Sequence, residues 1–193
     1  TYGELRTQAA ALRGGLAARG LQPGDRVALL CANNWYFVVS YLAALGAGLV
    51  VVPLNPLSPA PELQRELAEV GAGAVLVGPT AAAAFAALDR ATLPALETVI
   101  ACGNGGPAAR WPIDAVSIDQ LLGGEPAPIV ERSPDDLAAL LFTSGTAGRP
   151  KAAMLSHGNL LANIEQIKAD PSRSIHAADV GLGVLPLFHI FGL

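Results

Sequence analysis

Residues 26–54 read RVALLCANNWYFVVSYLAALGAGLVVVPL, and this stretch decides the fold. Residues 27–31 form a continuous apolar run with the length of a strand that is covered on both faces. Asn33 or Asn34 can cap a helix that begins directly after them, and residues 49–54 return as a second strand. Two buried strands joined through a helix pair in parallel, so this stretch predicts a βαβ unit.

The same region could be mistaken for a membrane span. No charged residue occurs from Val27 to Ala60, and residues 35–54 are about as long as a bilayer-crossing helix. Two glycines and three consecutive valines interrupt this run, and the turn-forming sequence Pro-Leu-Asn-Pro closes it at residues 53–56. We therefore predict a buried helix followed by a buried strand, and no transmembrane segment.

The alternation of strands and helices continues on both sides of this unit. Upstream, apolar residues at helical spacing predict a helix over residues 5–19 that ends at Gly20. Downstream, the pattern predicts a helix, a strand, a second helix and a second strand at residues 59–70, 74–77, 81–88 and 98–101. Repeated βα units predict an α/β protein with a mostly parallel sheet and flanking helices.

A region rich in glycine and proline, residues 103–134, is expected to form a loop-rich connection. It divides the chain into two predicted parts. Residues 1–134 would form an α/β subdomain. Residues 135–193 would hold a buried strand, a glycine-rich loop, and a following helix and strand.

Composition and charge restrict the function. Of the 193 residues 52% are apolar and 15% charged, as in globular proteins. The net charge of −4, with no cluster of basic residues, argues against a nucleic-acid partner. Cys31 and Cys102 are far apart and lack metal-ligand spacing, so we expect reduced core residues. Without a secretory signal in this sequence we expect a cytoplasmic protein, with attachment to a membrane surface and a homodimer both left open.

The chemistry is concentrated at residues 143–151, which read TSGTAGRPK after an apolar strand. Glycines let backbone N–H groups approach anionic oxygens, hydroxyls donate further hydrogen bonds, and Lys151 adds a positive charge. A generic cluster of this kind is a turn. The combination of hydroxyls, glycines, proline and lysine in this order favours a site for a polyphosphate.

Other nucleotide-binding motifs do not fit. A Walker loop has four residues between its first glycine and Gly-Lys, and a helix follows at once. Here residues 152–155 suit a short strand, and a helix begins only at Ser156 or His157. His157 is expected to have a capping or core role. A dinucleotide-binding oxidoreductase would need Gly-x-Gly-x-x-Gly after the first strand, where residues 32–34 read Ala-Asn-Asn.

With these residues in view, the chain resembles the adenylate-forming superfamily, which includes acyl-CoA synthetases, peptide-synthetase adenylation domains and beetle luciferases. Residues 143–151 match its signature Thr-Ser-Gly-Thr-(Thr/Ser)-Gly-x-Pro-Lys except at Ala147, and Ala152 replaces the glycine that usually follows. The similarity also covers residues 24–28, 44–56, 155–157 and 185–192. It implies the amino-terminal part of that superfamily's AMP-binding domain.

The resemblance also implies substrates and site residues. ATP and Mg²⁺ would be held by the phosphate loop, with Thr146 as a candidate Mg²⁺ contact. The nucleotide-binding positions of this loop would be Thr143, Ser144, Gly145, Thr146, Ala147, Gly148 and Lys151. The apolar segment 185–192 would lie beside the acyl group. Its His189, otherwise an ordinary core histidine, becomes a candidate acyl-site residue.

The implied activity is that of an AMP-forming carboxylic acid:CoA ligase acting on a fatty or aromatic acid. An adenylation domain for an amino acid or for loading a carrier-protein thiol is the alternative enzyme. A non-enzymatic nucleotide-binding module is the alternative from another class. Since the chain ends directly after an apolar motif at Leu193, we expect a fragment that is inactive by itself.

Overall fold

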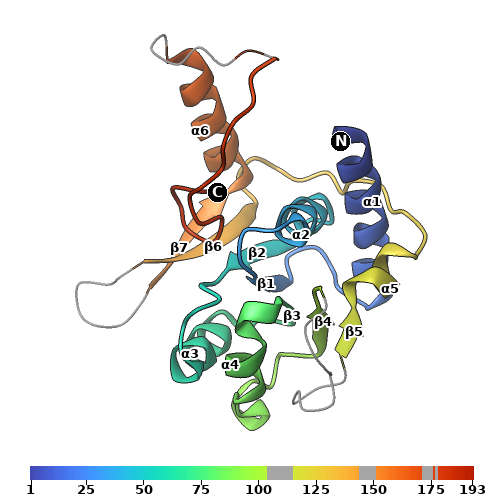
Figure 1. The fold of residues 1–193 in the computed structure, drawn as a ribbon, viewed down its shortest axis with the longest axis vertical. Helices are drawn as coiled ribbons and strands as arrows, with labels where there is room; N and C mark the ends of the chain where they lie inside the picture. The colour runs from blue at the N-terminus through green and yellow to red at the C-terminus, as the bar shows by residue number, and fades with distance from the viewer. Residues whose placement is uncertain (104–114, 144–150, 171–175, 177) are drawn as a thin grey trace.

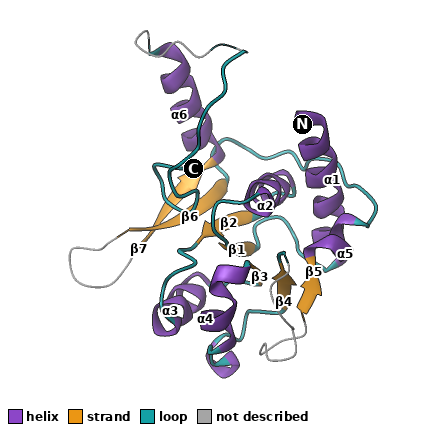
Figure 2. Ribbon diagram, in the orientation of Figure 1, coloured by secondary structure: helices purple, strands orange, loops and turns teal. Residues whose placement is uncertain are grey.

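The computed structural model describes residues 1–103, 115–143, 151–170, 176 and 178–193 (Figures 1 and 2). These residues form a seven-stranded sheet in the order β5-β4-β3-β1-β2-β6-β7. The strands are β1 (Arg26–Leu30), β2 (Val50–Pro53), β3 (Ala74–Val77), β4 (Thr98–Ala101), β5 (Ala115–Ser117), β6 (Leu137–Thr143) and β7 (Lys151–Ser156). All neighbouring pairs are parallel except β6 and β7. The predicted mostly parallel α/β sheet is confirmed.

Helices cover both faces of this sheet (Figure 2). On one face lie α1 (Tyr2–Ala18), α2 (Trp35–Gly46) and α5 (Ile118–Leu122), and on the other α3 (Ala60–Val70) and α4 (Ala82–Ala86). Strand β1 explains the two layers, because Val27 and Leu29 enter the first core while Ala28 and Leu30 enter the second. A strand buried on both faces must be apolar throughout, which is why its sequence shows no alternation.

The predicted βαβ unit is confirmed, with one difference in its helix. Tyr36 and Phe37 of α2 are buried, and Tyr41 stacks on Phe37 with ring centroids 6.3 Å apart. This helix was expected to be buried, but its first residue, Trp35, is 46% exposed. No helix among the described residues is long and apolar enough to cross a membrane.

The connection between residues 103 and 134 contains more structure than its composition predicted. Strand β5 extends the sheet beside β4, and α5 follows it directly. Ser117 and Gln120 form a reciprocal capping box at the start of α5, while Val116, Ile118 and Leu121 are buried. The prediction of a loop here was wrong because a three-residue strand and a five-residue helix are too short for a clear periodicity.

After α5 the chain crosses the outer side of α1 and α2 before it enters β6 (Figure 1). The Ala127 N–H donates to Ala10 O (3.0 Å), and the Val130 N–H donates to Gly46 O (2.8 Å). Arg13 Nε donates to Ala127 O (3.1 Å). The sheet continues across residue 134 because β6 pairs with β2, while the division into residues 1–134 and 135–193 stays a prediction.

The last described helix, α6 (His157–Ala169), extends away from the sheet (Figure 1) and buries none of its residues. From Asp170 to Leu193 the described residues form turns and irregular chain. The strand expected after this helix is therefore absent from the part of the chain that the structure describes. Apolar residues in this irregular segment, such as Val180 and Leu182, are exposed.

Candidate functional site

The predicted phosphate loop is framed by an antiparallel pair of strands. Thr143, the last residue of β6, lies opposite Lys151, the first residue of β7. The Thr143 hydroxyl donates to the Lys151 carbonyl oxygen over 3.3 Å. The prediction that this loop joins two strands is confirmed. Residues 144–150 lie outside the described residues, so the predicted roles of Ser144, Gly145, Thr146, Ala147 and Gly148 stay predictions.

The two described ends of this loop have the accessibility that a binding role needs. Thr143 and Lys151 are both exposed, whereas residues 138–141 of β6 are buried. None of the ion pairs among the described residues involves Lys151. A lysine ammonium in this position can offer its charge and three donors to an anion.

The hairpin is fixed at its other end by the start of α6. Ser156 caps this helix, since its hydroxyl accepts from the Asn159 N–H (3.2 Å) and the Asn159 side chain accepts from the Ser156 N–H (3.0 Å). The His157 and Gly158 N–H groups donate to the carbonyl oxygens of Asp136 and Pro134. Strand β6 therefore starts and β7 ends at one hydrogen-bonded turn, which holds the two strands in register.

The sequence predicts a capping or core role for His157, but Ser156 occupies the cap position of α6. His157 is the first residue of α6, partly buried, and its Nε2 atom has no hydrogen-bond partner among the described residues. Burial lowers the pKa of His157, and the nearby positive charge of Arg132 lowers it further, while Asp136 opposes both. The lowered pKa favours the neutral form of the imidazole near pH 7.

The predicted acyl-site segment, residues 185–192, lies at the same edge of the sheet as the end of the hairpin formed by Thr143 and Lys151. Strands β1, β2 and β6 are mutually parallel, so their carboxyl ends meet at one edge. Asn33 follows β1 at this edge and binds the distant segment through its side chain. Its Nδ2 donates to Leu185 O (2.8 Å), and its Oδ1 accepts from the Leu187 N–H (2.8 Å).

Sequence reasoning missed this role for Asn33. The residue was considered as a cap for α2, but the structure places Asn34 at the cap position and gives it no side-chain capping bond. The bonds of Asn33 span 152 and 154 residues. No local sequence signal could have identified partners at that separation.

The candidate acyl-site residue, His189, is exposed rather than packed in a core. Its ring stacks on Phe191, with centroids 5.5 Å apart and an interplanar angle of 16°. Nδ1 accepts a hydrogen bond from the Phe191 N–H (3.4 Å). A neutral imidazole that accepts at Nδ1 carries its proton at Nε2, so His189 can donate a hydrogen bond to a carboxylate or carbonyl oxygen.

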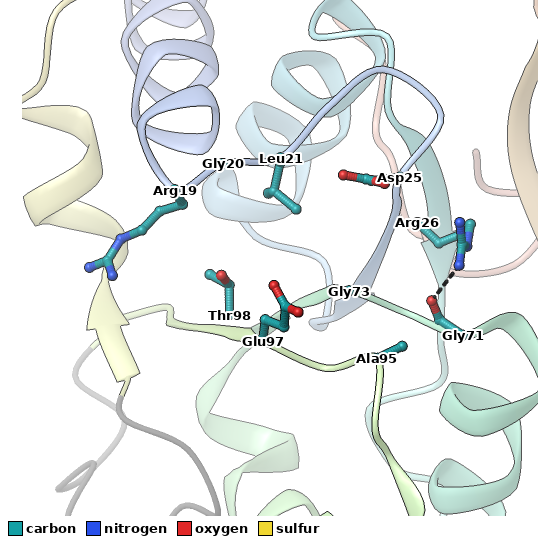
Figure 3. Close-up of a pocket in the computed structure, with 10 residues that line it drawn as sticks. All are labelled: Arg19, Gly20, Leu21, Asp25, Arg26, Gly71, Gly73, Ala95, Glu97 and Thr98. Atoms are coloured by element: carbon teal, nitrogen blue, oxygen red, sulfur yellow. Dashed lines mark hydrogen bonds between the residues drawn. The ribbon is translucent and has the colours of Figure 1, made fainter.

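A pocket of about 320 Å³ opens at the opposite edge of the sheet (Figure 3). Its lining includes Arg26 at the start of β1, Thr98 at the start of β4, and Gly73 before β3. Arg26 is occupied within the fold, because Nε donates to Val70 O (3.0 Å) and Nη2 to Gly71 O (2.9 Å). This pocket contains none of the residues predicted for the site, and ligands of open parallel sheets bind at the other edge.

The sequence profile of AMP-binding enzymes matches residues 1–193, so the chain belongs to that family. It is 37% identical to a feruloyl-CoA synthase of an Amycolatopsis species over 198 residues, 100% of this chain and 35% of that protein. It is 34% identical to a long-chain-fatty-acid–CoA ligase of Escherichia coli O157:H7 over 211 residues, 97% of this chain and 37% of that protein.

Solved structures show the same fold. Apo MatB from Rhodopseudomonas palustris aligns with a TM-score of 0.79 and 30% identity, covering 100% of this chain and 36% of MatB. The ATP-bound form of MatB aligns with a TM-score of 0.77 and 33% identity, covering 99% of this chain and 36% of that structure. The chain thus spans about a third of the length of the curated relatives and solved structures that it matches.

Proposed function

We propose that the complete gene product is an AMP-forming acyl-CoA ligase. In the first half-reaction, a carboxylate oxygen of the acid attacks the α-phosphorus of ATP, the bond between that phosphorus and the α–β bridging oxygen breaks, and pyrophosphate leaves. In the second, the thiol sulfur of CoA attacks the carbonyl carbon of the acyl-adenylate, loses its proton, and displaces AMP. Reactions at phosphorus of this kind depend mainly on positioning and charge neutralisation.

The observation that carries this proposal is that two predicted site segments lie at the same edge of the sheet. The predicted phosphate loop begins at the carboxyl end of β6. Asn33 holds residues 185–187 at the carboxyl end of β1, and β1 and β6 run in the same direction. The attacking acid and the nucleotide must lie side by side for the first half-reaction. An exposed lysine and an exposed histidine donor at the same edge suit these two partners.

Within this scheme the chain's own residues bind and orient the reactants. The Thr143 hydroxyl and the Lys151 ammonium would contact the phosphates together with Ser144, Gly145, Thr146, Ala147 and Gly148. His189 would donate from Nε2 to an oxygen of the acid. Mg²⁺ would be held by phosphate oxygens and by the hydroxyl of Thr146, the candidate protein contact, because Mg²⁺ prefers oxygen ligands. Bound Mg²⁺ would neutralise charge on the polyphosphate.

For the acid, we propose a fatty or an aromatic carboxylic acid, with CoA as the thiol. The relatives described above support both kinds, because one is a feruloyl-CoA synthase and another a long-chain-fatty-acid–CoA ligase. The apolar character of the segment that carries Phe188 and Phe191 supports the same choice, since such side chains can contact an aliphatic chain or an aromatic ring.

The first prediction tests this function in the complete gene product. Acid-dependent pyrophosphate release is measured with ferulate, coumarate and long-chain fatty acids, followed by CoA-dependent AMP release. Lys151→Met removes a charge that contacts phosphate, so we expect kcat/KM for ATP to fall about 10- to 100-fold. Lys168→Met is the matched control, because Lys168 is exposed on α6 and pairs with Glu165.

Other results would identify the alternatives. Pyrophosphate release with amino acids alone, or transfer to a carrier-protein thiol and not to CoA, would assign an adenylation domain. ATP binding by calorimetry without turnover on any acid would assign a non-enzymatic nucleotide-binding module. Full activity of Lys151→Met would contradict the assignment of the phosphate loop itself.

Two properties of the assembly stay predictions. A homodimer is tested by light scattering of the complete gene product, and attachment to a membrane surface by co-sedimentation with phospholipid vesicles. Neither property is needed for the chemistry proposed above.

A further inference from the structure

Asn33 joins two parts of the chain that are remote in sequence. It is exposed and follows β1, where the chain turns toward α2. Its side-chain amide uses both of its functional groups on one piece of backbone, donating to Leu185 O and accepting from the Leu187 N–H, each over 2.8 Å. The Asn33 side chain thus makes one donated and one accepted hydrogen bond to the backbone, as the backbone of a neighbouring strand would.

The bound segment also packs against the core. The side chains of Leu187 and Phe188 pack against the core cluster that α1 and α2 form on the sheet. Beyond them the chain folds back on itself, because the His189 N–H donates to Pro186 O (3.0 Å) and the Gly192 N–H to His189 O (2.8 Å). The position of the His189 ring therefore depends on where residues 185–187 are attached.

We infer that Asn33 is a positioning residue that sets the place of the acyl-site segment at the carboxyl edge of the sheet. The inference rests on the proposed function, in which His189 and its neighbours face the acid. Asn33 does not contact the reactants. It fixes the backbone two to four residues before His189, so that the histidine meets the acid at the edge where the phosphate loop holds ATP.

The chemistry of the amide explains why asparagine serves here. The segment presents one acceptor, Leu185 O, and one donor, the Leu187 N–H, and only a side chain with both a donor and an acceptor satisfies them. Asn33→Asp keeps an acceptor for Leu187 but places a carboxylate oxygen against Leu185 O. Asn33→Ala removes both bonds.

Gln64 offers a matched control elsewhere in the molecule. Its amide makes the same kind of two-bond bridge, donating to Asp89 O (3.0 Å) and accepting from the Asp89 N–H (2.7 Å). Gln64 belongs to α3 on the other face of the sheet. Gln64→Ala therefore removes these two bonds and a third bond, to the Thr92 hydroxyl, without touching residues 185–191.

The test uses steady-state kinetics of the complete gene product. We expect Asn33→Ala and Asn33→Asp to raise KM for the acid about 5- to 30-fold, as the loss of one or two hydrogen bonds implies, with KM for ATP changed less than about twofold. Gln64→Ala should leave both KM values unchanged. An unchanged KM for the acid in Asn33→Ala, or an equal rise for acid and ATP, would overturn the inference.

Hydrogen exchange separates this inference from the proposed function. In Asn33→Ala the amide of Leu187 loses its acceptor, so the peptide that contains residues 185–191 should exchange faster, and the Gln64→Ala protein should match the wild type there. This measurement needs no activity. If the wild type activates no acid, the proposed function fails while faster exchange still shows that Asn33 holds the segment; equal exchange in Asn33→Ala and wild type would refute the role of Asn33.

Discussion

Glu66 is a carboxylate on the buried face of α3. Its side chain lies between Leu63 and Leu67 in the core-facing stripe of the helix, it is only 6% exposed, and Oε2 has no hydrogen-bond partner among the described residues. Burial raises the pKa of Glu66 to about 7, and the negative charges of Glu62 and Glu69 add to the rise. Burying this carboxyl group without a hydrogen-bond partner for Oε2 lowers the free energy of unfolding, and an apolar side chain at this position would not have that effect.

The pH dependence of stability follows from this shift. In the unfolded chain Glu66 titrates near 4.5, so it is ionised there at a pH where the folded state still binds the proton. The free energy of unfolding is therefore highest, as far as Glu66 is concerned, below about pH 4.5. It falls as the pH rises from about 4.5 to about 7, and above that it no longer changes with the titration of Glu66. Glu66→Gln keeps a neutral side chain at every pH, so we expect it to raise the free energy of unfolding at pH 8 by about 1–3 kcal/mol.

The measurement is urea unfolding at pH 5 and pH 8, with Glu131→Gln as the control. Glu131 is exposed, lies outside α3 and is not among the groups that shift the pKa of Glu66, so its replacement should change stability little at either pH. A Glu66→Gln protein with the same pH dependence as the wild type would show that Glu66 is ionised within the fold.

At the scale of elements, the close approach of α1 and the segment after α5 depends on glycine. A Cβ on Gly14 would lie 1.8 Å from the carbonyl oxygen of Glu125, and one on Gly15 would lie 2.8 Å from the Cβ of Leu121. These are contacts with backbone and with a rigid part of a side chain, so they cannot be relieved by rotation. Residues 14 and 15 therefore let α5 and the chain that leads to β6 pass directly over α1.

Replacing Gly14 by alanine tests this packing. Alanine in the middle of a helix normally stabilises by about 1 kcal/mol relative to glycine. Here the clash with Glu125 must push the crossing segment away, so we expect a net loss of about 1–3 kcal/mol, measured by urea unfolding. Gly3→Ala is the control on the same helix, because the nearest atom to its Cβ is Thr1 Oγ1 at 3.8 Å, and it should give the ordinary gain. A gain at both positions would mean that α1 and the crossing segment do not touch at Gly14.

At the scale of the whole molecule, the described residues divide into a buried α/β layer and an exposed apolar surface. Strands β1 to β4 are almost entirely buried, whereas α6 buries nothing and exposes Leu161 and Ile164. Met154 on β7 is 70% exposed, and Phe191 is 80% exposed. Contiguous exposed apolar groups are typical of interaction surfaces, so we expect these residues to contact other protein.

The 193-residue polypeptide prepared by itself should show this surface. We expect it to bind the dye ANS and to self-associate, as measured by light scattering. We also expect no acid-dependent pyrophosphate release, because the chain spans about a third of its relatives' length. The double substitution Leu161→Lys with Ile164→Lys should reduce dye binding and association, while Ala17→Lys on α1, which is exposed and distant in the fold, should not. Equal dye binding by all three proteins would place the exposed apolar surface elsewhere.

Much of this molecule follows from the sequence alone, because the relevant signals are local. The continuous apolar runs at residues 27–31 and 74–77 predict strands covered on both faces, and those strands are present. The capping residue Ser156 and the sequence after it predict where α6 begins. The order of residues 143–151 predicts a phosphate loop and indicates the family, and the family profile confirms the family.

Only the tertiary structure decides which distant residues meet. The order of the strands, with β6 beside β2 and β5 at the far edge, depends on pairing between segments far apart in the chain. The burial of Glu66 and the two hydrogen bonds of Asn33 have the same origin. A helical or strand period reports the neighbours of a residue along the chain, while these contacts join residues that the folded sheet brings together, so no pattern in the sequence could specify them.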